Sequence, residues 1–204
     1  MHLRLLIIGL VLFPLAHTLK CHRCIEGFSA CPEMQCPAEK NQCGTIRLIT
    51  YNGNSMISDF KSKSCAATQD CLQGSLNVGV SKFILTSECC SSDLCNNKNA
   101  PEPPKTKPNG KKCYRCDGNE DCRGTVNCEG DENQCIKVSV TAGGITQTLK
   151  GCATRNICSA TWSIPGVNSK INCCEGNYCN GVNGVRASLL VLATMLMSHF
   201  FLSK

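Results

Sequence analysis

"SECCSSDLCNN" (residues 87–97) and "INCCEGNYCNG" (residues 171–181) each contain two adjacent cysteines, then a third cysteine five positions later, then an asparagine. Side chains of adjacent residues point in different directions, so the two members of each pair must bond to different partners. A chain that makes this demanding arrangement twice contains a repeated structural unit.

The remaining cysteines show the same repetition. Ten of the 20 cysteines lie in residues 21–95 and ten in residues 113–179. The steps between them are 3, 7, 5, 7, 22, 6, 18, 1, 5 in the first half and 3, 6, 6, 7, 17, 6, 15, 1, 5 in the second. Short steps are kept and long ones vary, as expected when loops differ between fixed anchor points. The chain therefore contains a duplicated ten-cysteine module.

The cysteine density indicates an oxidising compartment, because small secreted domains use disulfides in place of a large core. Residues 1–18 fit this expectation: Arg4 precedes an apolar run, and small residues stand before a cleavage point. We interpret them as a signal peptide, since the run is too short to span a bilayer. The mature chain is then expected to begin at Leu19.

The net charge of +6 is spread unevenly along the 204 residues. Residues 19–98 carry 8 Lys/Arg against 7 Asp/Glu, residues 99–112 carry 4 against 1, and residues 113–180 carry 6 against 7. Neither module has the basic excess typical of nucleic-acid binding, so no nucleic-acid partner is expected.

Residues 99–112 contain four prolines and four lysines. Proline restricts the backbone and removes hydrogen-bond donors, so this segment is predicted to be a semi-rigid linker without strand pairing. Exposed and unpaired backbone is where proteases cut first. We therefore expect limited trypsin cleavage after Lys98, Lys105, Lys111 or Lys112.

The long gaps between cysteines have the pattern of β-hairpins. Residues 44–64 place "NGN" between two strand-like runs, which is a strong turn signal. The corresponding "IKVSVTAGGITQTLKG" alternates Ile136, Val138 and Val140 onto one face. Neither module has a helical period, so each is predicted to be a small all-β domain.

Both modules resemble the three-finger domains of the lymphocyte-antigen/urokinase-receptor (LU) family, which is related to snake neurotoxins. The matching motifs are "LKCHRC" and "KKCYRC" at the module starts and "CCSSDLCN" and "CCEGNYCN" at their ends. The resemblance covers residues 19–180. It implies an all-β, small, disulfide-rich fold with two three-finger domains in tandem, residues 19–98 and 113–180.

The residues alone leave the disulfide connectivity open among hundreds of pairings. The resemblance implies that the asparagine after the last cysteine of each module, Asn96 or Asn180, ties the end of the module to its core. It also implies ten bonds: Cys21–Cys43, Cys24–Cys31, Cys36–Cys65, Cys71–Cys89, Cys90–Cys95, Cys113–Cys135, Cys116–Cys122, Cys128–Cys152, Cys158–Cys173 and Cys174–Cys179.

No catalytic or metal site is expected. The CxxC spacing at the module starts suits zinc, but paired cysteines after a signal peptide favour disulfides. Of the four histidines only His22 lies within a module, and we interpret it as a satisfied, partly exposed side chain rather than a general base. One group of carboxylates in the second module is interpreted as a solvated acidic loop: Asp117, Glu120, Asp121, Glu129, Asp131 and Glu132. The sequence thus predicts no enzyme activity and no cofactor.

Binding of an extracellular protein partner is the remaining function, as the resemblance also implies. Tyr51, Asn52, Asn54 and Met56 are expected near the tip of one hairpin, and Trp162 in the third finger of the second module. Exposed Tyr and Trp are frequent contact residues at interfaces. Packing within their own fingers is the alternative for these side chains.

The C-terminal apolar run, Leu189 to Leu202, would form a helix of roughly 21 Å, short for a hydrocarbon core of about 30 Å. A small-residue site, a spacer and a short apolar tail are instead typical of a glycosylphosphatidylinositol (GPI) signal. We expect residues 181–204 to be removed and Asn180 or Asn183 to carry the anchor on the outer leaflet. The chain is thus predicted to be a GPI-anchored receptor or adhesion protein. The alternative is a secreted inhibitor that resembles the two-module LU phospholipase inhibitors.

Overall fold

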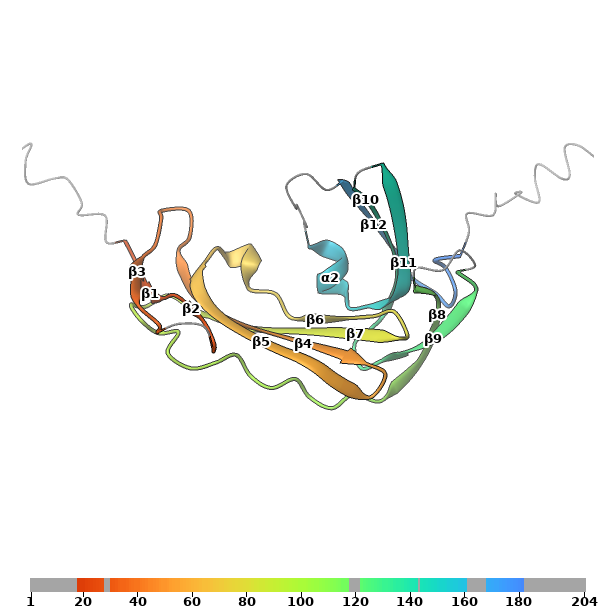
Figure 1. Cartoon of the computed structure of the whole chain (residues 1–204), viewed down its shortest axis with the longest axis horizontal. Helices are drawn as coiled ribbons and strands as arrows, with labels where there is room; N and C mark the ends of the chain where they lie inside the picture. Colours follow the sequence, from red (N-terminus) through yellow and green to blue (C-terminus); the bar gives the residue numbers. More distant parts are fainter. Residues whose placement is uncertain (1–17, 28–29, 118–121, 143, 161–167, 182–204) are drawn as a thin grey trace, which may run out of the picture. The chain divides into compact units, whose positions relative to one another are not determined.

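The structure is a computed structural model that describes residues 18–27, 30–117, 122–142, 144–160 and 168–181 (Figure 1). Contacts divide the chain into two compact units. Unit 1 comprises Met1–Ile49, Ser58–Leu72 and Leu85–Pro103, and unit 2 comprises Thr50–Ile57, Gln73–Ile84 and Pro104–Lys204, within the described ranges. Unit 2 thus holds the second module together with the tips of two hairpins of the first module.

Strands dominate the first module, as predicted. They pair in the order β6-β7-β4-β5-β2, and β1 pairs separately with β3. The β4–β5 hairpin corresponds to the one predicted at residues 44–64, and Gly53 has a φ of 57° in its turn, a conformation that favours glycine. The elements are β1 (Lys20–His22), β2 (Cys24–Ile25), β3 (Glu33–Gln35), β4 (Gln42–Asn52), β5 (Ser55–Ala66), the 3₁₀ turn η1 (Thr68–Asp70), β6 (Gly74–Asn77) and β7 (Ser81–Cys90).

The second module is built in the same way, with the strand order β12-β10-β11 and with β8 paired to both β11 and β9. Its elements are β8 (Pro108–Asp117), β9 (Gly124–Glu129), β10 (Gln134–Ala142), β11 (Ile145–Ala153), α2 (Arg155–Ser159) and β12 (Asn168–Cys174). The all-β, disulfide-rich fold class is confirmed. The five-residue helix α2 was not predicted, because a single turn is too short to leave a periodic pattern.

The predicted linker is partly a strand. Residues 108–112 belong to β8, where Pro108 pairs with Glu129 and Lys112 with Asn127. The prediction of unpaired backbone is therefore wrong for these residues. Proline is compatible with the first position of a strand, where its missing N–H costs no ladder bond. Upstream, the Thr86 hydroxyl donates to the Pro101 carbonyl at 2.7 Å, within unit 1.

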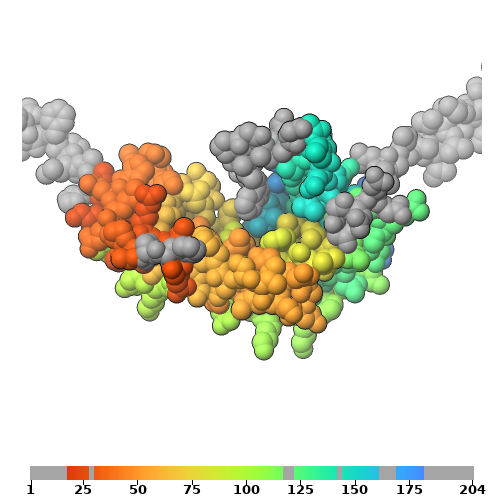
Figure 2. Space-filling view, viewed as in Figure 1, coloured from red at the N-terminus to blue at the C-terminus, as the bar shows by residue number. Residues whose placement is uncertain are grey.

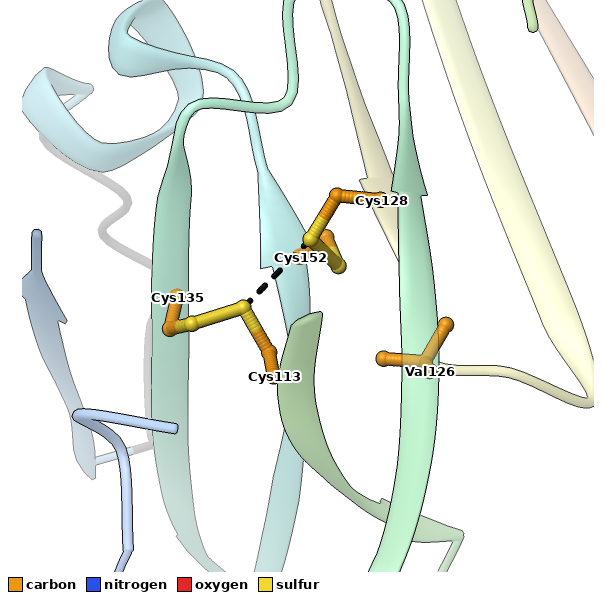
Figure 3. Close-up of a cluster of buried hydrophobic side chains, with 5 residues drawn as sticks. All are labelled: Cys113, Val126, Cys128, Cys135 and Cys152. Atoms are coloured by element: carbon orange, nitrogen blue, oxygen red, sulfur yellow. Dashed lines mark hydrogen bonds between the residues drawn. A yellow bond between two sulfur atoms is a disulfide. The ribbon is translucent and has the colours of Figure 1, made fainter. Parts of the chain in front are cut away.

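Disulfides form the centre of each module. In the second module, the buried Cys113–Cys135 and Cys128–Cys152 bonds pack against Val126 (Figure 3). The sulfurs of Cys113 and Cys128 lie 3.4 Å apart, and since both belong to disulfides this is a van der Waals contact. In the first module the equivalent cluster contains Cys21, Cys36, Cys43 and Cys65.

All 20 cysteines are bonded in the structure, in the ten pairs that the resemblance implies. The pairs are Cys21–Cys43, Cys24–Cys31, Cys36–Cys65, Cys71–Cys89, Cys90–Cys95, Cys113–Cys135, Cys116–Cys122, Cys128–Cys152, Cys158–Cys173 and Cys174–Cys179. The adjacent cysteines of each module thus serve two different bonds. One joins a distant cysteine, Cys71 after η1 or Cys158 in α2, and the other closes a five-residue step.

The asparagine after the last cysteine of each module is buried, and both the oxygen and the nitrogen of its side-chain amide form hydrogen bonds. Asn96 accepts from the His22 N–H at 2.9 Å and donates to the His22 and Gly44 carbonyls. Asn180 accepts from the Tyr114 N–H at 3.0 Å and donates to the Tyr114 and Ile136 carbonyls at 2.9 Å. Each amide therefore holds the end of its module against the first strand.

Within unit 2, strand β6 pairs with β11, with Asn77 opposite Cys152 and Leu76 opposite Ala153. The neighbouring Gly151 is surrounded closely, because a Cβ at this position would collide with the carbonyl group of Asn77 and the Cα of Val78. Glycine at this position therefore permits the two backbones to approach.

A candidate binding site at the hairpin tips

The turn between β4 and β5 projects polar and apolar side chains together. The Gly53 N–H donates to the Val80 carbonyl at 2.8 Å, which fixes this turn against the β6–β7 turn within unit 2. Asn52 and Asn54 are exposed beside it, and Tyr51 is partly buried. Figure 2 shows the β4–β5 hairpin, coloured orange, at the molecular surface.

Two apolar neighbours on β5 are both exposed, Met56 by 56% and Ile57 by 62%. Successive residues of a strand point to opposite faces, so a hairpin with one buried face would cover one of them. Both faces of this tip are therefore open to solvent. Val80 is also exposed. We call the set Tyr51, Asn52, Asn54, Met56, Ile57 and Val80 the tip patch.

The structure brings four of the five predicted contact residues together: Tyr51, Asn52, Asn54 and Met56 lie at one turn. The fifth, Trp162, lies outside the described residues. Ile57 and Val80 were not predicted from the sequence. Strand alternation predicts that either Met56 or Ile57 faces a core. Both are exposed because, among the residues that the structure describes, no layer covers the tip.

The interpretation of a solvated acidic loop is wrong for Glu132, whose side chain is fully buried. Its carboxylate accepts from the Ser75 hydroxyl at 2.8 Å and from the Glu129 N–H at 2.9 Å, and the Lys82 ammonium lies 3.7 Å away. Burial is the main cause that raises the pKa of Glu132. Glu120, Asp121 and the side chain of Asp117 lie outside the described part.

The described residues offer no catalytic constellation around His22. Its Nδ1 atom is buried and has no hydrogen-bond partner there, so the expected satisfied histidine is not observed. Two trios of cysteine sulfurs lie within 4.8 Å of one another, Cys21/Cys36/Cys65 and Cys113/Cys128/Cys152. All six are in disulfides and offer no thiolate to a metal.

Described residues of unit 1 line two surface hollows. The larger, about 530 Å³, contains Lys61 and Lys63, but Lys61 pairs with Glu26 at 2.8 Å and Lys63 donates to the Asn97 carbonyl at 2.5 Å. Both ammonium groups therefore already have a hydrogen-bonding partner within the protein, and that of Lys61 also has a counter-charge. Among the described residues, no helix has the length and hydropathy needed to cross a membrane.

Each of the two modules matches a separate family model. Residues 17–98 match the family model of the u-PAR/Ly-6 domain, and residues 112–180 match that of snake toxin and toxin-like proteins. Together these two models account for most of the chain.

Among curated relatives, the rat urokinase plasminogen activator surface receptor is 24% identical over 208 residues, covering 91% of this chain and 63% of the receptor. The chain thus spans less than two thirds of that receptor. A gamma-type phospholipase A2 inhibitor of Laticauda semifasciata is 29% identical over 135 residues, covering 61% of this chain and 74% of the inhibitor. The crystal structure of mouse TEX101 aligns with a TM-score of 0.32 at 16% identity, over 78% of this chain and 99% of that one.

Proposed function

Since the chain belongs to the LU family of three-finger domains, we propose that it is a GPI-anchored binding protein on the extracellular side of the plasma membrane. Its relatives include a surface receptor and inhibitors rather than enzymes, which supports a receptor, adhesion or ligand-modulating role without catalysis. The partner is an extracellular protein.

The tip patch is the proposed contact surface for this partner. The observation that carries the proposal is the joint exposure of Met56, Ile57 and Val80 at two adjoining turns, because exposed apolar side chains that gather on one part of a surface mark interaction sites. Asn52 and Asn54 provide hydrogen-bonding groups at the rim, and an apolar centre with a polar rim is typical of protein interfaces.

The anchor is proposed at Asn183 rather than Asn180. A GPI anchor is linked to the main-chain carboxyl group of the last retained residue. Asn180 is buried and its side chain donates to the carbonyls of Tyr114 and Ile136, so an anchor at Asn180 would leave no spacer residue between the folded module and the lipid. Asn183 follows this structural asparagine by three positions.

Cell-surface cross-linking tests the contact surface. Cells that display the full chain are treated with an extracellular cross-linker, and the captured proteins are compared with those of Met56→Ser/Ile57→Ser. The control is Ile145→Ser, which removes a side chain of similar exposure (69%) from the tip of the β10–β11 hairpin. Loss of one partner in the double variant only supports the tip patch, whereas equal capture by all three proteins contradicts it.

Phosphatidylinositol-specific phospholipase C tests the anchor. Release of the surface protein by the enzyme supports a GPI anchor, and Asn183→Gln should then reduce surface display while Asn180→Gln reduces folding. Secretion without enzyme would favour the alternative, a soluble inhibitor like the phospholipase A2 inhibitor relatives.

A further inference from the structure

The β12-β10-β11 sheet of the second module has one apolar face and one polar face. Residues opposite one another in antiparallel strands project to the same face. The alternating residues Ile136 and Val138 pack with Ile157 of α2 in the apolar core. The other face carries Lys137, Ser139 and Thr141 on β10.

The register extends this second face across three strands. Lys137 lies opposite Lys150 on β11 and Asn172 on β12, and Ser139 lies opposite Thr148 and Lys170. Thr141 lies opposite Thr146, and their hydroxyls are 2.8 Å apart. We call this set the lysine face; its members are Lys137, Ser139, Thr141, Thr146, Thr148, Lys150, Lys170 and Asn172.

Lys150 is a buried cation on this face. The residue is only 5% exposed, and among the described residues no carboxylate contacts its ammonium group. Burial, together with the nearby Lys137 cation, lowers the pKa of Lys150. A buried lysine beside another lysine is costly unless an anion approaches. The lysine face therefore holds a positive charge that these residues do not compensate.

The composition of the face indicates the kind of anion. The eight residues include three lysines, four hydroxyl side chains and one amide, which all donate hydrogen bonds to oxyanions. None is aromatic, so the face offers no platform for nucleobase stacking. None is a large apolar residue of the kind that inserts into a lipid surface.

The spacing favours an extended ligand. Neighbouring strands are about 4.8 Å apart, so donors on three strands span roughly 10 Å across the sheet. We propose that the lysine face binds a sulfated glycan chain, whose repeated sulfate groups would contact Lys137, Lys170 and the hydroxyl side chains between them. The lysine face shares no residue with the tip patch. A test can therefore contradict glycan binding by the lysine face without contradicting partner binding by the tip patch, and the reverse.

Binding to heparin tests the proposal. The full-length chain, purified in detergent, is applied to immobilised heparin over a range of salt concentrations. We expect retention that weakens about fivefold for each of Lys137→Gln and Lys170→Gln, as for lysines at other anionic surfaces. The dependence of log affinity on log salt should fall by about one for each lysine removed. Lys105→Gln, an exposed lysine outside the face, is the matched control and should change neither quantity.

Lys150→Met separates binding from folding. If the buried charge serves an anion, this variant binds heparin more weakly while its resistance to denaturant equals or exceeds that of the wild type. A variant that loses stability and keeps heparin binding would show that Lys150 is structural and overturn its role. Unchanged retention in Lys137→Gln/Lys170→Gln overturns the whole proposal. Preference for phosphatidylserine vesicles or single-stranded DNA over heparin does so as well.

Discussion

The hydroxyl of Ser75 donates a hydrogen bond of 2.8 Å to the fully buried carboxylate of Glu132, joining residues 57 positions apart within unit 2. Lys82 follows on the same hairpin as Ser75 and pairs with Glu129 at 2.6 Å. The tip of the β6–β7 hairpin is therefore held by an acidic segment of the second module through direct polar contacts.

Glu132 should make stability depend on pH. Because its pKa is raised in the folded protein, the folded state keeps the proton to higher pH than the unfolded chain. The contribution of Glu132 to the free energy of unfolding is therefore greatest at low pH and falls as the pH rises from the ordinary carboxyl pKa through the raised one. Glu132→Gln removes this component while it can still accept from the Glu129 N–H.

Denaturant unfolding of both proteins at several pH values measures this effect. The stability of Glu132→Gln relative to the wild type should rise with pH and then level off. Glu175→Gln, an exposed carboxylate, is the control and should show no such trend. A difference that is constant with pH would mean that Glu132 titrates normally.

The Arg47–Asp59 pair should have the opposite pH dependence. Hydrogen bonds from the Arg47 guanidinium at 2.8 and 2.9 Å lower the pKa of Asp59. Its stabilising contribution is thus present above the unfolded pKa and lost as the pH falls through the folded pKa. Both side chains are mostly covered, so Asp59→Asn should cost about 1 kcal/mol at neutral pH.

The Arg155–Glu175 pair provides the comparison for Asp59→Asn. Its distance is similar, 3.0 Å, but both side chains are more than 70% exposed. Solvent screens such pairs, so Glu175→Gln should leave the unfolding midpoint unchanged. Equal effects of the two substitutions would contradict the role given to burial.

The contribution of each disulfide to the free energy of unfolding should increase with the length of the loop that it closes. The chain-entropy model gives about 3.5 kcal/mol for Cys128–Cys152, with a sequence separation of 24, and about 2.2 kcal/mol for Cys174–Cys179, with a separation of 5. Replacing each pair by alanines and comparing thermal unfolding measures this order.

Peptide mapping of the wild type should find no bond between the two modules.

Trypsin should distinguish the two parts of the predicted linker. Lys105 is exposed and outside any strand, whereas Lys111 and Lys112 lie in β8. We expect early cleavage after Lys105 or Lys98 and slow cleavage after Lys111 and Lys112. Mass spectrometry of early fragments identifies the sites. Early cuts after Lys112 would indicate that the β8–β9 pairing opens readily.

The cysteine spacing was enough to predict two disulfide-rich modules, because the short steps between cysteines repeat along the chain. It left hundreds of pairings open, so the three-finger fold and the ten bonds were predicted only from the resemblance of the motifs at the module ends to the LU family. The turn residues Asn52 and Asn54 were predictable from local sequence, since the turn motif sets the hairpin. Glu132 was not, because its environment depends on Ser75 and Lys82, which no local pattern connects to it. The lysine face was hidden too: the net charge of a module does not reveal the side of a sheet on which each charge lies.

Gly151 limits which modules can be combined when a tandem protein of this kind is engineered. Any larger residue at position 151 would collide with the backbone at Asn77 and Val78. The second module therefore needs a glycine there to pack against β6 of the first module within unit 2. A chimera that takes residues 113–180 from a relative without this glycine should fail at the junction even if the grafted part folds well. The second module of such a protein is therefore exchangeable only for one that keeps a glycine at this position.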